Sequence, residues 1–215
     1  MNARTNLLAR SAAGALAATM LACGCAVAPH ADHFSVPAAG TTLIYKQRNS
    51  GSFGAGDATT VMKVGETTWQ GRRAVTYARE KSTTDVQDMA THKMLATLGP
   101  DGKTAMTYDP PFGYELPFMV GKSWIGKTSV NVAATGKVMV VETRSTIEAY
   151  EDVTVPAGTF KAWRIRMVNV NGEEQVIWTS TADGHAVKRS FVRPASHPEG
   201  AGTREVELVS RTLPR

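Results

Sequence analysis

Cysteine is almost absent from this chain of 215 residues: its two cysteines, Cys23 and Cys25, both lie near the N-terminus. The body of the protein therefore has neither a disulfide framework nor a cysteine-based zinc site. Charged residues are also modest in number, at 20% of the chain against 42% hydrophobic residues. That balance allows a buried core and argues against disorder, and the length suits one domain.

Catalytic motifs are absent as well. The sequence contains no Gly-x-Ser-x-Gly elbow, no Ser-x-x-Lys, no His-Glu-x-x-His and no phosphate-binding loop. The adjacent acids Glu151-Asp152 and Glu173-Glu174 would point to opposite faces of a strand, so neither pair converges on a substrate. These absences predict a protein that is not an enzyme and that needs no cofactor. An enzyme with a dispersed site is the less favoured alternative.

Histidines offer little sign of a metal site. His30 and His33 flank Asp32 and make a His-x-x-His clip conceivable, but no third ligand follows nearby, so a polar linker is the better interpretation. His185 follows the turn signal Asp183-Gly184 and could act as a base. A histidine beside a hairpin tip is more often solvated, and we expect no metal.

The first residues predict a targeting signal. Arg4 and Arg10 form a positive region, and an uncharged run of twelve residues, Ser11–Ala22, follows it. A helix needs roughly 20 residues to span a bilayer, so this run is too short for a transmembrane helix.

The signal ends in Met20-Leu21-Ala22-Cys23-Gly24-Cys25, and small residues before a cysteine resemble a bacterial lipoprotein cleavage site. We expect the lipid on Cys23, with Cys25 as the alternative. A secretory signal cut near Ala26 or Ala28 is less favoured. The expected organisation is a signal peptide at 1–22, a lipidated cysteine and tether at 23–39, and one β domain at 40–215.

Charge and sorting then predict where the domain resides. Cleavage before Cys23 removes two arginines and no acid, which lowers the formal net charge from +5 to +3. So small a surplus, without clusters, argues against nucleic acid as a partner. No Asp follows either cysteine, and the resemblance to Gram-negative lipoproteins then implies the periplasmic face of the outer membrane, with the acyl chains as the membrane anchor.

From Thr41 onward the pattern is strand after strand, with turn signals every 8–12 residues and no sustained helical stripe. Turns this short require mostly antiparallel pairing. Asn171-Gly172 is the strongest hairpin signal and predicts a type I′ turn. The fold class is therefore all-β: an antiparallel sandwich or a strongly curved open barrel of about 11–12 strands. The expected strands are Thr41–Arg48, Thr59–Val64, Arg73–Arg79, Val86–Met94, Val138–Thr143, Thr146–Tyr150, Val153–Val155, Lys161–Val170, Glu173–Ser180, Ala186–Val192 and Arg204–Arg211.

The segment Tyr108–Trp124 differs from ordinary strand sequence because it holds three prolines and several aromatic residues. Proline cannot donate to a sheet ladder, so part of the segment must cross the surface or the mouth of the sheet. It either covers the core, which is the commoner role of such loops, or lines an apolar ligand site. The candidate ligand-binding residues are Tyr108, Phe112, Tyr114, Phe118 and Trp124.

Three stretches carry a resemblance: Leu116–Trp124 (LPFMVGKSW), Val155–Phe160 (VPAGTF), and Trp178 followed by Gly184 and Val187-Lys188-Arg189. They are similar to those of a family of uncharacterised β-rich periplasmic proteins of bacteria. At the level of fold that family resembles the LolA/LolB-like lipoprotein carriers, whose curved sheet cups acyl chains. The resemblance covers about Tyr108 to Val209 and implies architecture and a lipid-like ligand. It supplies no catalytic residue, and the chain lacks helices to plug a half-barrel.

Two functions follow. The favoured one is an envelope lipoprotein whose β domain binds an apolar or amphipathic, lipid-like ligand such as an acyl chain. The alternative is a structural or adaptor lipoprotein that holds a protein partner in the cell envelope through a strand edge or its loops.

Overall fold

The structure is a computed structural model that describes residues 29–33 and 35–214. Fourteen strands form in these residues. In chain order they are β1 (His30–Ala31), β2 (Thr42–Gly51), β3 (Gly56–Trp69), β4 (Arg72–Arg79), β5 (Thr84–Asp88), β6 (Met94–Leu98), β7 (Thr104–Phe112), β8 (Phe118–Met119), β9 (Ser123–Val132), β10 (Lys137–Val155), β11 (Gly158–Asn169), β12 (Glu174–Ser180), β13 (Ala186–Arg193) and β14 (Gly202–Thr212).

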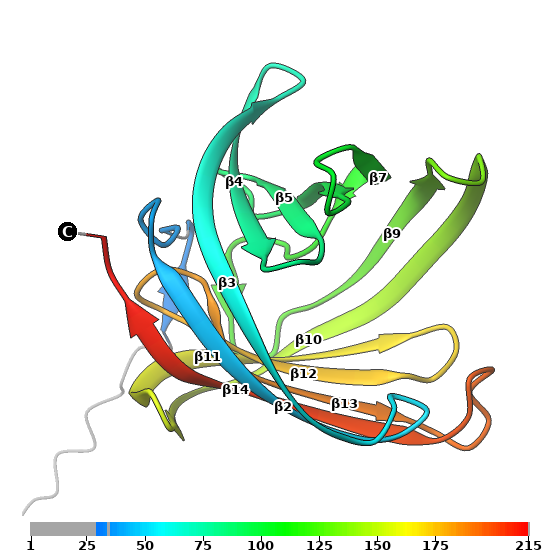
Figure 1. The fold of residues 1–215 in the computed structure, drawn as a ribbon. Coiled ribbons are helices and arrows are strands. Elements are labelled where there is room, and N and C mark those ends of the chain that lie inside the picture. Colours follow the sequence, from blue (N-terminus) through cyan, green and yellow to red (C-terminus); the bar gives the residue numbers. More distant parts are fainter. Residues whose placement is uncertain (1–28, 34, 215) are drawn as a thin grey trace, which may run out of the picture.

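Twelve of these strands form a closed antiparallel barrel in the order β10-β11-β12-β13-β14-β2-β3-β4-β5-β6-β7-β9 (Figure 1). The two ends of the sheet meet where β9 pairs with β10, from Val132↔Lys137 to Ser123↔Thr146. The predicted all-β antiparallel class is therefore confirmed. Of the shapes left open by the sequence, a curved sheet is the one that forms, and it closes on itself. Across the described residues, no helix has the length and apolar character needed to cross a membrane.

The strand boundaries differ from prediction along β10. Where the sequence predicts three short strands, β10 runs unbroken for 19 residues and bends at a bulge between Ile147 and Ala149. A bulge adds one residue to one strand without ending its ladder, so the alternation shifts and the sequence pattern looks interrupted.

The predicted strand Val86–Met94 is wrong in the opposite sense, because a turn divides it. β5 ends at Asp88, whose Oδ1 accepts hydrogen bonds from the amides of Ala90 and Thr91 at 3.0 and 2.9 Å. His92 then takes a positive φ of 56°, and β6 begins at Met94. An aspartate that bonds to amides two and three residues ahead is a turn former, and here it outweighs the strand pattern.

The proline-rich segment is only partly a crossing loop. β7 continues through Pro110 and Pro111 to Phe112, although its ladder with β9 ends at Asp109. Thr128 Oγ1 donates to the carbonyl of Pro110 at 2.8 Å, which attaches this end of β7 to the barrel. The crossing segment is therefore residues 113–122, shorter than predicted.

The predicted tether is also partly structured. β1 pairs with β8 through His30↔Met119 and Ala31↔Phe118, beside the barrel. His30 Nε2 lies 3.4 Å from Asp32 Oδ1. Over residues 29–33 and 35–214, no three histidine, cysteine or acidic side chains gather as a metal site would need. The predicted signal peptide and the candidate lipidation residues Cys23 and Cys25 lie outside the described residues.

The Asn171-Gly172 hairpin forms between β11 and β12 as predicted, but its turn is not type I′. A type I′ turn needs positive φ at both central residues. Gly172 has a φ of 76°, whereas the non-glycine residues with positive φ in the described chain are Gln70, Lys81 and His92. Asn169 Oδ1 instead accepts hydrogen bonds from the amides of Asn171 and Glu173, which supports a wider loop.

Two apolar clusters fill one end of the barrel, which we call the filled end. The first packs Leu43, Val64, Val75, Val187 and Leu208 from adjacent strands. The second gathers Phe118, Ile147, Trp163, Ile165 and Ile177. Burial at about 25 cal/mol per Å² of apolar surface makes these clusters the main source of stability.

Candidate ligand-binding cavity

The inward side of several neighbouring strands changes character along its length. On β2, Leu43 and Tyr45 are followed by Gln47, and on β4, Val75 and Tyr77 are followed by Arg79. Because alternate residues share a face, the same side of each strand passes from apolar to polar. We call the polar part of the interior the hollow end; its inward residues include Gln47, Thr60, Arg79, Arg189 and Arg204.

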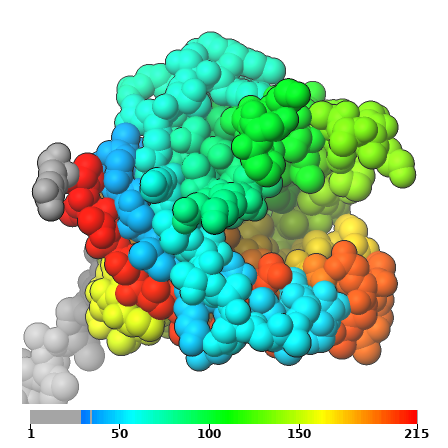
Figure 2. Space-filling view, viewed as in Figure 1, coloured from blue at the N-terminus to red at the C-terminus, as the bar shows by residue number. Residues whose placement is uncertain are grey.

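Two adjoining cavities lie in the interior, with volumes of about 170 and 260 Å³. The second occupies the hollow end, and the first lies where the hollow end meets the filled end, since Ile177 of the second cluster lines it. Tyr45, Met62 and Arg189 line both of them. Figure 2 shows the surface hollowed between the green region of β5–β7 and the yellow-to-orange region of β12 and β13. Together the two cavities reach the lower part of the roughly 300–1,000 Å³ typical of small-molecule sites.

The first cavity has a mainly apolar wall interrupted by a few polar groups. The apolar members are Met62, Met94, Phe112, Met167, Ile177 and Ala186. Methionine is flexible and polarisable, so a wall rich in methionine adapts to apolar ligands of different shape. The polar members include Asp85, Gln87 and Gln175.

Tyr45 and Tyr77 line the first cavity together with Tyr114, and burial keeps the hydroxyls of Tyr45 and Tyr77 protonated. Burial raises the pKa of Tyr45 to about 12, against the opposing charge of Arg189. Burial likewise raises the pKa of the Tyr77 hydroxyl well above its usual value. The Tyr45 hydroxyl donates to the carbonyl of Ala186 at 2.7 Å. Within the part of the chain that the structure describes, no hydrogen bond engages the Tyr77 hydroxyl, which leaves it as a donor facing the cavity.

The structure divides the predicted aromatic site. Phe112 and Tyr114 line the first cavity. Tyr108 lies elsewhere, on a surface depression with Trp69 and Pro111, and its hydroxyl is 3.3 Å from Thr97 Oγ1. Contact of Phe112, Tyr114 and Tyr108 with a ligand stays a prediction. The positions of Phe112 and Tyr114 on the cavity wall are compatible with that prediction.

Phe118 and Trp124 belong to the filled end. Phe118 is fully buried and meets Trp163 edge to face, with ring centroids 5.7 Å apart. Trp124 packs on the same cluster and donates Nε1–H to the carbonyl of Gly113 at 3.3 Å. Here the crossing segment covers the core, which is the commoner of the two roles that the sequence left open.

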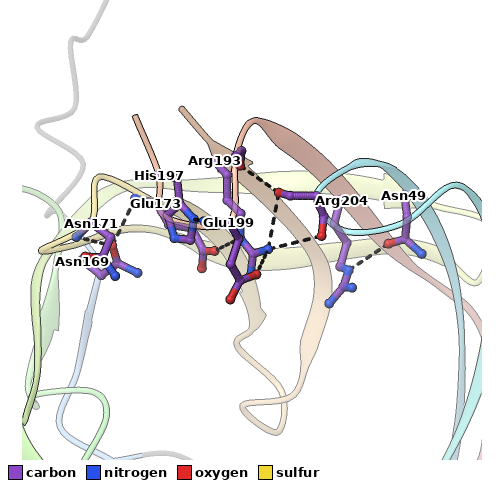
Figure 3. Close-up of polar contacts among 10 residues, drawn as sticks. Asn49, Asn169, Asn171, Glu173, Arg193, His197, Glu199 and Arg204 are labelled. Atoms are coloured by element: carbon purple, nitrogen blue, oxygen red, sulfur yellow. Dashed lines mark hydrogen bonds and ion pairs between the residues drawn. The ribbon is translucent and has the colours of Figure 1, made fainter. Parts of the chain in front are cut away.

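Most interior arginines are compensated by acids. Arg79 donates to both carboxylate oxygens of Asp85, and Arg211 forms a close ion pair with Asp183. Arg193 holds Glu173 through Nε at 2.6 Å and also pairs with Glu199 (Figure 3). Such pairing is what burial of a guanidinium ordinarily demands.

Arg193 also takes part in a cluster at the rim of the hollow end. Its guanidinium lies 3.9 Å from the ring centroid of Phe53, and that of Arg204 lies 4.6 Å from the same centroid. Arg204 Nε donates to Asn49 Oδ1 at 2.8 Å (Figure 3). These contacts join β2, β13 and β14 beside the second cavity.

Arg189 is the exception among the interior arginines. It lines both cavities from β13, yet no ion pair or hydrogen bond engages its guanidinium within residues 29–33 and 35–214. Its charge acts on Tyr45 and Tyr77, lowering the pKa of each against the larger effect of burial.

His185 is buried, so the expectation of a solvated histidine is wrong. The Asp183-Gly184 turn folds against the barrel, and the His185 Nδ1 atom contacts Asp183 Oδ1 in a close pair. Burial acts to raise the pKa of Asp183, but the hydrogen bond and charge of His185 and the charge of Arg211 outweigh it, so that pKa is lowered. His185 also lines the first cavity, and its buried Nε2 has no hydrogen-bond partner among the described residues.

The sequence pattern missed Arg189 and the Asp183–His185–Arg211 cluster. Lys188 and Arg189 are adjacent cations on a strand, and alternation alone does not say which of them points inward. The available signal was Val187, an apolar residue two positions before Arg189 and therefore on the same face.

No protein-family model and no curated protein sequence matches this chain. Three solved structures are similar in backbone. A protein from Bacteroides fragilis, proposed to be exported and with a YmcC-like fold, has a TM-score of 0.49 and 12% identity over 84% of this chain and 99% of its own. A proposed lipoprotein from Parabacteroides distasonis has a TM-score of 0.46 and 11% identity, covering 85% and 99%. The hypothetical lipoprotein YmcC from Escherichia coli has a TM-score of 0.42 and 13% identity, covering 84% and 91%.

Proposed function

We propose that this protein is a lipid-anchored envelope protein whose barrel binds an apolar or amphipathic small molecule and performs no catalysis on it. The observation that carries the proposal is the pair of adjoining cavities inside the barrel, with methionine and aromatic side chains on their walls. A barrel mouth is a common place for such a site.

The anchor is the part of the proposal that rests on sequence. Cys23, or alternatively Cys25, carries the lipid, and the domain stands on the periplasmic face of the outer membrane of a Gram-negative bacterium. Labelling with radioactive palmitate in such a host tests this: Cys23→Ala should abolish labelling and Cys25→Ala should not. The reverse result would move the lipid to Cys25, and an unlabelled wild type, or labelling that persists when both cysteines are changed to alanine, would exclude the anchor.

The absence of catalysis is supported by how the acid pairs are used. Glu173 and Glu174, adjacent on the chain, bind Arg193 and Arg166 respectively. Glu151 accepts from Trp178 Nε1 at 2.8 Å, while Asp152 pairs with Lys161 at 2.8 Å. Each acid is thus engaged in a different structural contact, and neither pair directs two carboxylates at a common point.

The ligand itself is best sought on the full chain purified from a bacterial envelope. Native mass spectrometry, followed by organic extraction, should find a lipid-sized adduct. Met62 lines both cavities, so Met62→Trp should fill the space and remove the adduct. Met119→Trp is the matched control, because Met119 is 45% exposed and lines neither cavity. An unmodified mass for the wild type, or an equal adduct in Met62→Trp with its fold intact, would contradict ligand binding.

A second candidate function is that of an adaptor for an envelope protein. It is favoured by the β9–β10 hairpin, where Val138, Met139 and Val140 are 61%, 47% and 60% exposed. Exposed apolar side chains in a row often mark a protein contact. Crosslinking from position 139 in cells separates the two functions: an adaptor should give a defined protein adduct that Val140→Asp removes, whereas a ligand carrier should give none.

A further inference from the structure

Among the described residues, Arg189 is the charged side chain that lines both cavities, and no acid pairs with it there. Arg79 and Arg193 at the hollow end, and Arg211 near Leu43 of the filled end, each contact at least one carboxylate. Arg204 is held by Asn49 and by the face of Phe53. The chain therefore compensates its enclosed arginines as a rule, and Arg189 departs from that rule.

The lining of the second cavity is positively charged as a whole. Arg79, Arg189 and Arg204 contribute to it, and none of its lining residues is acidic. Asp85, which neutralises Arg79, lines the first cavity instead. An uncompensated guanidinium in a partly enclosed site is costly unless water or an anion satisfies it.

A second donor lies in the same space. The Tyr77 hydroxyl lines the first cavity with Arg189, remains protonated, and is not used by the described residues. A guanidinium offers a planar fork that matches a carboxylate or phosphate, and a phenol adds a single donor to such an anion. Met94, Phe112 and Met167 give the same cavity an apolar wall.

We propose that the ligand is an anionic amphiphile whose carboxylate or phosphate head binds Arg189 and the Tyr77 hydroxyl, with its apolar body against the methionine and phenylalanine side chains of the first cavity. This rests on the proposed function and adds the class and the orientation of the ligand. Arg204 and Arg79 add to the positive potential at the head without needing to touch it.

The test compares ligands that differ only in their heads. Dodecanoate, dodecyl phosphate and dodecanol are titrated into the full chain held in amphipol, and binding is followed by equilibrium dialysis. The anions should bind at least about tenfold more tightly than the alcohol, since hydrogen bonds to charged groups are the stronger ones. Whichever of dodecanoate and dodecyl phosphate binds more tightly identifies the head group. Inorganic phosphate and acetate should bind far more weakly, because they lack the apolar body.

The variants assign the head to Arg189. Arg189→Gln should lower the affinity for the anions about tenfold or more and leave dodecanol unchanged, and Tyr77→Phe should have a smaller effect of the same sign. Arg144→Gln makes the same change of charge at an exposed position outside both cavities and should have no effect. Circular dichroism and thermal unfolding establish that each variant is folded.

The outcomes are distinct. Equal affinity for dodecanol and the anions, or unchanged anion binding in Arg189→Gln, would overturn the anionic head while leaving a ligand-binding barrel intact. Binding of inorganic phosphate as tight as that of dodecyl phosphate would mean a simple anion site and would also overturn the proposal. Failure of all three alkyl compounds to bind, together with an adduct-free native mass, would overturn both the head and the proposed function.

Discussion

The two ends of the barrel interior are built from the same strands but have opposite chemistry. At the filled end, Leu43, Val187 and Leu208 are fully buried among apolar neighbours. Two to four residues further along the same strands, Gln47, Arg189 and Arg204 line the second cavity, at the hollow end. The strand pairing continues through both ends, so what separates them is the choice of inward side chain.

The comparison shows how one barrel can be stable and still contain internal cavities. Burial at the filled end supplies the stabilisation, and the closed ladder carries the backbone of the hollow end without needing a packed interior there. The hollow end is then free to carry polar groups that a core would exclude. If this division is right, equivalent changes at the two ends should differ widely in their effect on stability and on ligand binding.

The largest difference is expected for an aromatic residue removed from each end. Trp163 is 2% exposed at the filled end, and Trp163→Ala should lower the free energy of unfolding by about 3–5 kcal/mol. Phe191 is half-buried and lines the second cavity. Phe191→Ala should lower the free energy of unfolding by only about 1 kcal/mol, because its side chain already borders empty space. Urea denaturation measures both, and equal losses would mean that the hollow end is as tightly packed as the filled end.

The buried carboxylate of Asp183 should make the free energy of unfolding depend on pH. Asp183→Asn leaves His185 and Arg211 without their carboxylate, and about 3 kcal/mol should be lost at neutral pH. Because the pKa of Asp183 is lowered in the folded protein, its stabilisation is complete above its unfolded pKa of about 3.9 and is lost as the pH falls through the lower, folded value. Unfolding measured between pH 7 and pH 2 should therefore be less steeply acid-dependent in the variant. An identical slope would show that other carboxylates cause the acid sensitivity.

Within the hollow end, two arginines of β13 should respond in opposite ways. Arg193→Met leaves Glu173 and Glu199 unpaired and should cost about 2 kcal/mol. Arg189→Met removes a charge that has no partner in the described chain, so the ligand-free protein should keep its stability or gain up to about 1 kcal/mol. Thermal unfolding of both variants without ligand is the measurement. A marked loss for Arg189→Met would mean that this side chain is structural, and would weaken its assignment to a ligand.

The sequence predicted the chemistry of the filled end better than that of the hollow end, for a physical reason. Inward residues such as Val153 and Val155 are separated by the polar Thr154, and that alternation identifies a strand and its buried face. At the hollow end both faces are polar, as with Lys188 and Arg189, and the pattern no longer says which one is inside. The charged interior could therefore not be predicted from alternation alone.

The sequence could not predict the closure of the barrel, for a related reason. β7 contains Pro110 and Pro111, and β9 has few apolar residues at regular spacing, so neither segment carries a strong strand pattern. Each is held in the sheet by pairing with strands distant in sequence, which local propensity does not report. The sequence marks the aromatic segment as distinctive, yet the placement of Phe112 in the cavity, of Phe118 in the core and of Tyr114 against both depends on where β7 ends.

The smallest change in the free energy of unfolding should come from an exposed ion pair that belongs to neither end of the interior. It provides a reference for the larger changes. Arg166 and Glu174 form a close pair with side chains 44% and 34% exposed, and the hydrogen bond from Arg166 lowers the pKa of Glu174. Solvent screens such a pair, so Arg166→Gln should change the free energy of unfolding by less than about 0.5 kcal/mol, and less still in high salt. The same measurement on Arg193→Met should show a loss several times larger that salt does little to reduce. If Arg166→Gln and Arg193→Met lost the same free energy of unfolding, enclosure at the rim would add little to the strength of an ion pair. The assignment of Arg189 to a ligand would then depend only on its lack of a partner in the described chain.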